Sequence, residues 1–220
     1  MKARDSILAE IRASLGRGPL PAVEAALADD RIRQHPAGPI PARAQKTGEA
    51  LAATFISMAE GVSATAERLA SPDNIPAAVE RQLKGLGLSG GWVAAPHQVL
   101  KLLQWNNFPD LQVRFGGARG SDAVALTVAT AGVAETGTLI FVSSPECPSD
   151  HCFLPETQIA VLRTFDLVGS YEEFWRRLRQ TGGTPATVNF VTGPSRTGDI
   201  EQTIQLGAHG PRRLHILLVG

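Results

Sequence analysis

The chain has 220 residues, 43% of them hydrophobic, and its 21 Lys and Arg residues are balanced by 21 Asp and Glu residues. This length suits one large domain or two small ones. A net charge of zero argues against a nucleic-acid partner, since nucleic-acid-binding proteins carry a basic excess. No stretch approaches the ~18 apolar residues of a membrane span, and the first residues lack the apolar centre of a signal peptide. We therefore expect a cytoplasmic protein without a membrane span.

Residues 1–46 predict an N-terminal helical arm followed by a Pro-rich linker. Apolar residues recur at helical spacing between residues 3 and 16, after which Gly and Pro end the helix. Between Arg17 and Gln45 prolines interrupt a stretch of alanine and charged residues, with room for a second helix over residues 22–33. Such an arm packs on its own domain or on a partner subunit.

Residues 47–220 predict one α/β domain in which short apolar strands alternate with helices. Helices are expected near residues 47–61, 75–86, 97–103 and 199–207, and one begins at the capping-box pair Ser170 and Glu173. Strands are expected near residues 62–66, 91–96, 111–115, 158–168, 187–193 and 213–220, and two more flank a turn at residues 135–138. This alternation predicts a mostly parallel sheet covered by helices on both faces.

The segment TGPSRTGDIE, residues 192–201, is a candidate anion site between a predicted strand and a predicted helix. Ligands of open α/β sheets bind outside the carboxyl ends of strands, and a helix N-terminus there suits a phosphate or carboxylate. Arg196 is expected to add a bidentate grip. In the alternative interpretation, Ser195 or Thr197 only caps the helix and Arg196 pairs with Asp199. The candidate binding residues are Thr192, Gly193, Ser195, Arg196, Thr197 and Asp199.

His209 and Glu135 are the candidate catalytic residues. His209 lies in the Gly-flanked turn LGAHGP, residues 206–211, where a histidine can act as acid, base or anion ligand. Glu135 lies between two apolar strands, where a carboxylate is costly to bury without partners and can serve as a base or nucleophile. The alternatives are a loop histidine that bonds a helix end and an exposed hairpin tip.

The segment CPSDHC, residues 147–152, holds both cysteines of the chain. Its spacing is not a standard zinc pattern, and two thiolates do not complete the four-cysteine shell of an iron–sulfur cluster. We expect no metal or cofactor in this chain. Three prolines nearby favour a mobile loop with incidental thiols, or a lid.

Four segments together resemble the lactate utilization protein C family, whose shared unit is called the LUD domain. They are ETGTL from Glu135, LPETQI from Leu154, TGPSRTGDIE from Thr192 and LGAHGP from Leu206. The resemblance covers roughly residues 47–220, and a helical arm is also typical of the family. It implies a fold similar to the ribose-5-phosphate isomerase, glucosamine-phosphate deaminase and CoA-transferase group. The family commonly has Asp in place of Glu135, and His in place of Gln158, which argues against proton transfer at residue 158.

The resemblance also implies a role in oxidising L-lactate to pyruvate beside partner proteins that carry iron–sulfur clusters. In that role this chain binds a small carboxylate or phosphate, or assembles the complex. A second hypothesis is a free-standing enzyme of the same fold group that acts on a sugar phosphate, folate or acyl-CoA, with Glu135 as nucleophile. A third is a regulatory or scaffold protein that senses an anion.

Overall fold

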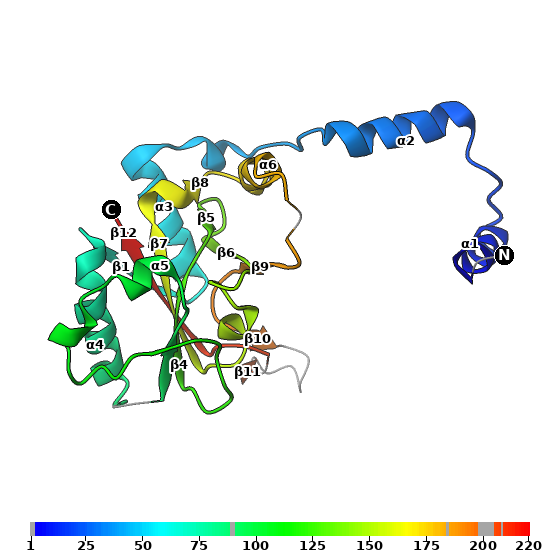
Figure 1. The fold of residues 1–220 in the computed structure, drawn as a ribbon. Helices are drawn as coiled ribbons and strands as arrows, with labels where there is room; N and C mark the ends of the chain where they lie inside the picture. The colour runs from blue at the N-terminus through cyan, green and yellow to red at the C-terminus, as the bar shows by residue number, and fades with distance from the viewer. Residues whose placement is uncertain (1–2, 89–90, 184, 198–204, 208) are drawn as a thin grey trace. The chain divides into compact units, whose positions relative to one another are not determined.

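The structure, a computed structural model, describes residues 3–88, 91–183, 185–197, 205–207 and 209–220 (Figure 1). The chain divides into two units, Met1–Pro39 and Ile40–Gly220. Within the described residues, no helix is both long enough and apolar enough to cross a membrane.

The first unit consists of α1 (Ala3–Ser14) and α2 (Ala22–Gln34), at the two places where helical spacing predicts them. Neither helix has a buried residue. The second unit begins earlier than the expected residue 47, because Ala44 is buried and the Arg43 Nε donates a hydrogen bond to the carbonyl oxygen of Glu135 at 3.2 Å. The last part of the expected linker therefore packs with the α/β domain.

A six-stranded parallel sheet forms the centre of the second unit, as the alternating pattern predicts. Its strand order is β1-β12-β7-β4-β2-β3. The strands are β1 (Thr65–Leu69), β2 (Trp92–Ala94), β3 (Arg114–Phe115), β4 (Val124–Val128), β7 (Thr157–Arg163) and β12 (Arg213–Val219). All five residues of β4 are buried, as expected for a parallel strand covered on both faces.

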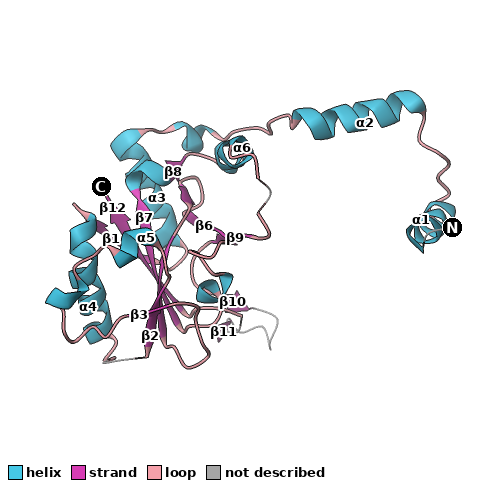
Figure 2. Ribbon diagram, viewed as in Figure 1, coloured by secondary structure: helices cyan, strands magenta, loops and turns pink. Residues whose placement is uncertain are grey.

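Helices α4 (Ile75–Gly85) and α5 (Gln98–Lys101) cover one face of this sheet (Figure 2). Ile75, Val79 and Leu83 of α4 lie in the same core cluster as Ile159 and Leu217 of the central strands. Because side chains alternate along a strand, the neighbours of Ile159 and Leu217 point to the opposite face.

On that opposite face, α3 (Gly48–Gly61) is joined by a second sheet, whereas the sequence pattern predicts helices alone. The second sheet has the order β8-β5-β6-β9, with β6 antiparallel to both neighbours. Its strands are β5 (Ala131–Val133), β6 (Thr138–Val142), β8 (Leu167–Val168) and β9 (Val188–Val191). Its outer face packs on α6 (Tyr171–Gln180), where Ser170 Oγ accepts a hydrogen bond from the Glu173 amide as the capping box predicts. Helix α6 thus covers the second sheet and not the central one.

The predicted helix over residues 199–207 is wrong where the structure describes it. Gln205–Leu206 (β11) pairs antiparallel with Arg196–Thr197 (β10), and residues 198–204 lie outside the described residues. Short helices are marginal by themselves, so pairing with a neighbouring strand overrides a helical pattern. The short 3-10 helices are η1 (Ala42–Gln45), η2 (Pro72–Asn74), η3 (Trp105–Asn107), η4 (Ser149–Cys152) and η5 (Thr164–Asp166).

Candidate functional site

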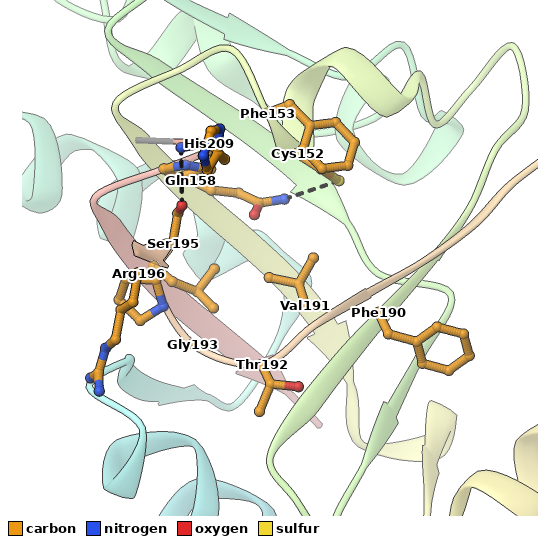
Figure 3. Close-up of a pocket in the computed structure, with 14 residues that line it drawn as sticks. Cys152, Phe153, Gln158, Phe190, Val191, Thr192, Gly193, Ser195, Arg196 and His209 are labelled. Atoms are coloured by element: carbon orange, nitrogen blue, oxygen red, sulfur yellow. Dashed lines mark hydrogen bonds between the residues drawn. The ribbon is translucent and has the colours of Figure 1, made fainter. Parts of the chain in front are cut away.

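A cavity of about 250 Å³ lies where the two motif loops meet the central sheet (Figure 3). Gln158 and Leu214 are the second residues of β7 and β12, so the cavity lies at the amino ends of these parallel strands and at the carboxyl end of β9. Ligands of open α/β sheets usually bind outside the carboxyl ends of the parallel strands, so the position of this cavity is different. The lining residues are Cys152, Phe153, Gln158, Phe190, Val191, Thr192, Gly193, Pro194, Ser195, Arg196, His209, Gly210, Pro211 and Leu214.

The segments TGPSRT and LGAHGP are joined by hydrogen bonds at Ser195. The Ser195 amide donates to the Pro211 carbonyl at 2.9 Å, and the Gly207 amide donates to the Ser195 carbonyl at 3.0 Å. The His209 amide donates to Ser195 Oγ at 3.3 Å. Five candidate residues therefore line one cavity: Thr192, Gly193, Ser195, Arg196 and His209.

Gly193 allows the first loop to pass directly over the end of α3. Its φ is +74°, and a Cβ atom built on it would lie 2.4 Å from the carbonyl oxygen of Val62. No side chain fits at that separation, and a positive φ is strained for other residues. Gly193 therefore shapes the cavity wall through its backbone.

The guanidinium of Arg196 is directed away from the cavity (Figure 3). Its Nη2 donates to the Val62 carbonyl at 3.0 Å and also to Ser63 Oγ. Val62 is the C-cap residue of α3, and cations are favourable at a helix C-terminus. In this structure Arg196 therefore fastens its loop to α3, and its guanidinium bonds the end of that helix.

The hydroxyl of Thr192 is also engaged outside the cavity. Thr192 Oγ1 lies 2.7 Å from Thr138 Oγ1, which in turn lies 2.8 Å from the Tyr171 hydroxyl and 2.7 Å from Thr136 Oγ1. These hydroxyls connect β6, the start of α6 and the first motif loop. Thr197 is 9% exposed and is not among the lining residues, and Asp199 lies outside the described residues.

Glu135 is buried but does not line the cavity. Its Oε1 accepts a hydrogen bond from the amide of Tyr171, the first residue of α6, at 3.3 Å. Its own amide donates to the Gly169 carbonyl at 3.2 Å. A carboxylate at a helix N-terminus is stabilised by the free amides and the helix dipole. Backbone groups therefore partner the buried Glu135, and Glu135 is not among the residues that line the cavity with His209.

Gln158 is a lining residue that is not among the site residues predicted from the sequence. It is 0% exposed, and its amide oxygen has no hydrogen-bond partner among the described residues. The signal in the sequence is a polar side chain that directly precedes four apolar residues of the strand, but its orientation depends on how β7 is placed. On that face Gln158 lies beside Leu214 of β12 and Ala125 of β4.

The segment Cys147–Cys152 is packed into the core, whereas the prolines near it predict a mobile loop. Both thiols are buried, and burial raises the pKa of Cys147 to about 11 and that of Cys152 to about 12. His151 is fully buried, and burial lowers its pKa below the usual value. In the part of the chain that the structure describes, no three His, Cys, Asp or Glu side chains are grouped to hold a metal ion.

The cavity combines polar groups at two depths with apolar walls. The Ser195 hydroxyl and the exposed His209 lie at the rim, and the Gln158 amide lies on the buried floor. A hydroxyl and an imidazole N–H both donate hydrogen bonds to an anion. The apolar lining residues include Val191 and Leu214. Such a cavity suits a small molecule with an anionic end, a polar group and little apolar surface.

A family model described as LUD domain matches residues 54–219. The lactate utilization protein C of Bacillus subtilis is 33% identical over 100 residues, 44% of this chain and 42% of that protein. An uncharacterized protein of Neisseria meningitidis serogroup B is 39% identical over 95 residues, 41% of this chain and 40% of that protein. The match thus spans less than half the length of these curated relatives.

The crystal structure of a DUF162 family protein from Deinococcus radiodurans superposes with a TM-score of 0.57 and 18% identity, covering 77% of this chain and 96% of that chain. At this identity the likeness concerns the fold alone.

Proposed function

Because this chain belongs to the LUD domain family, we propose that it is a cytoplasmic component of an L-lactate utilization system and binds a small carboxylate in the cavity between its two motif loops. The names of the matching lactate utilization proteins C support this role. The observation that carries the proposal is the convergence of Ser195 and His209, from separate motifs, on the rim of one cavity.

In the proposed site the carboxylate of the ligand lies at the rim. The Ser195 hydroxyl oxygen accepts a hydrogen bond from the His209 amide. The hydroxyl hydrogen of Ser195 is therefore free to donate to the ligand. The imidazole of His209 supplies a second donor. Arg196 acts indirectly, by holding the loop against Val62 and Ser63 at the end of α3.

Partner proteins that carry iron–sulfur clusters are the second part of the proposal. The family resemblance supports a division of labour in which this chain holds the carboxylate and the partners accept the electrons. The free-standing enzyme with Glu135 as nucleophile finds less support, because that carboxylate is held by the N-terminus of α6 away from the cavity.

Growth of a deletion strain on L-lactate as sole carbon source tests the role. We expect deletion to abolish growth, the wild-type chain to restore it, and co-purification to recover an iron–sulfur protein. His209→Ala should restore growth poorly, because it removes one of the two rim donors. The matched control is His97→Ala, since His97 lies outside the cavity lining and caps α5 by accepting from the Val99 amide at 3.2 Å. Normal growth of the deletion strain on L-lactate would overturn the proposal.

A further inference from the structure

The amide of Gln158 is the most deeply buried polar group that lines the cavity. The residue is 0% exposed, and Figure 3 shows its side chain reaching into the space bounded by Ser195, Val191 and Cys152. The amide oxygen, Oε1, has no hydrogen-bond partner among the described residues. Leaving a buried carbonyl unpaired costs free energy, so such a group in a cavity wall points to a ligand that supplies the missing partner.

The neighbours of Gln158 determine which end of its amide faces the cavity. Its Nε2 donates to Thr127 Oγ1 at 3.3 Å and to Cys152 Sγ at 3.6 Å. The Thr127 hydroxyl donates its only hydrogen to the Ile159 carbonyl at 3.4 Å, so its oxygen has to accept from Gln158. The NH₂ group is therefore turned towards Thr127, and the carbonyl oxygen is the end presented to the cavity.

We propose that Gln158 Oε1 accepts a hydrogen bond from a hydroxyl group of the ligand, so that the cavity selects a 2-hydroxy acid over the corresponding 2-keto acid. This inference rests on the proposed function, since it places the carboxylate at Ser195 and His209. The carboxylate and the 2-hydroxyl of such an acid are on adjacent carbons, so one small molecule carries a partner for the rim donors and one for the Gln158 oxygen. In the 2-keto acid, a keto oxygen at the same position would face Gln158 Oε1. Both oxygens are hydrogen-bond acceptors, so no hydrogen bond forms between them.

The size of the selectivity follows from the cost of an unpaired buried acceptor. A site built to bond a ligand hydroxyl rejects an analogue without it, because the buried group of the protein then stays unpaired. A difference of about 10- to 100-fold in affinity between L-lactate and pyruvate is expected at this burial. Propionate, which has no oxygen atom on carbon 2, should bind as weakly as pyruvate.

Thr127 is a positioning residue for this selectivity. It is 1% exposed and does not line the cavity. Thr127→Val keeps its shape but removes the oxygen that receives the Gln158 NH₂ group, so the amide is free to turn its NH₂ towards the cavity. The affinity for pyruvate should then rise relative to that for L-lactate, an effect that a merely structural role would not produce.

Calorimetric titration of the purified full chain with L-lactate, pyruvate and propionate tests the inference. Gln158→Met, which has similar size and no carbonyl, should bind L-lactate about 10-fold more weakly and lose the preference over pyruvate, and Thr127→Val should lower the same ratio. The matched control is Gln82→Met, because the Gln82 amide lies 3.1 Å from the His215 ring and outside the cavity lining. This variant should keep the wild-type ratio of affinities.

The possible results separate the two proposals. Equal affinities of the wild-type chain for L-lactate, pyruvate and propionate would overturn the role of Gln158 and leave the carboxylate site standing. No binding of any of the three acids would overturn the carboxylate site, and with it the selectivity. An unchanged ratio in folded Gln158→Met and Thr127→Val variants would also overturn the role of Gln158.

Discussion

The backbone amide of His209 donates a hydrogen bond to the side-chain oxygen of Ser195 at 3.3 Å, across the two loops that form the rim of the cavity. The two residues come from separate motifs, and strands β10 and β11 bring their loops side by side. One serine therefore holds the second loop in place and also presents its hydroxyl to the cavity. A substitution of Ser195 removes both roles, which ligand affinity and unfolding free energy measure separately.

Ser195→Ala should weaken L-lactate binding about 5- to 10-fold and lower the free energy of unfolding by about 0.5–1.5 kcal/mol. The matched control is Ser143→Ala, because Ser143 is also partly exposed and its Oγ accepts from the Thr187 amide at 3.0 Å, outside the cavity. It should lose similar stability and keep ligand affinity. Calorimetry and denaturant unfolding measure both quantities, and equal ligand affinities of the two variants would contradict the prediction.

Gly193→Ala should destabilise the fold by about 3 kcal/mol or more, since it combines a strained φ with a clash against Val62. Gly182→Ala is the control for the φ alone, because Gly182 has a φ of +75° and its Cβ would meet nothing within 4 Å. That variant should lose only about 1–2 kcal/mol. Urea unfolding of both variants gives the difference, and a difference near zero would mean that the loop moves off α3 at little cost.

Thr138→Val tests the hydroxyl cluster that fixes the base of the first motif loop. Thr138 is 0% exposed, and its Oγ1 lies within 2.8 Å of the hydroxyl oxygens of Thr136, Tyr171 and Thr192. Replacing it leaves these groups short of a partner, so we expect a loss of about 1–3 kcal/mol in unfolding free energy. Thr54→Val, on the surface of α3, should change stability by less than about 0.5 kcal/mol. Equal losses would rule out a special contribution of the cluster.

The free energy of unfolding should fall as the pH drops below about 6.5, in part because of His215. Burial lowers its pKa below the usual 6.5; the charge of Glu67 opposes this shift and that of Arg81 adds to it. The unfolded chain therefore takes up a proton near pH 6.5 that the folded protein takes up only at lower pH. Stability is full above about pH 6.5 and decreases between the two pKa values, by at most ~1.4 kcal/mol per pH unit for one histidine.

His215→Gln should flatten this part of the stability profile, whereas His35→Gln, in the exposed C-terminal turn of α2, should leave it unchanged. Unfolding measured at several pH values between 5 and 7.5 checks both variants. If His215→Gln kept the wild-type slope of unfolding free energy against pH, the environment of His215 would not disfavour its protonated form.

The two cysteines should resist alkylation while the protein is folded. Their raised pKa values, about 11 for Cys147 and about 12 for Cys152, leave on the order of one thiol in a thousand or fewer ionised at pH 8. Mass spectrometry after iodoacetamide treatment should find both unmodified in buffer and both modified in urea. Rapid native modification of Cys152 would mean that the cavity floor opens.

The sequence alone predicts the parallel sheet and most helices well, because their signals are local and repeated. The helical spacing before Gly61 predicts α3, and the capping box at Ser170 predicts the start of α6. Glu135 shows the limit of the same reasoning. Its apolar flanks predict burial that needs partners, but whether the partner is a ligand or the end of a helix depends on α6, which follows about 36 residues later.

The sequence by itself determined the family, the α/β class, and the two motifs that form the rim of the cavity. Only the tertiary structure decided that Arg196 bonds the end of α3, that residues 205–206 form a strand, and that Gln158 lies on the cavity floor. The physical reason is the range of the forces involved. Periodicity and capping act within a few residues, whereas the direction of a guanidinium or an amide is set by hydrogen-bond partners that are distant in the chain, such as Val62 for Arg196 and Thr127 for Gln158.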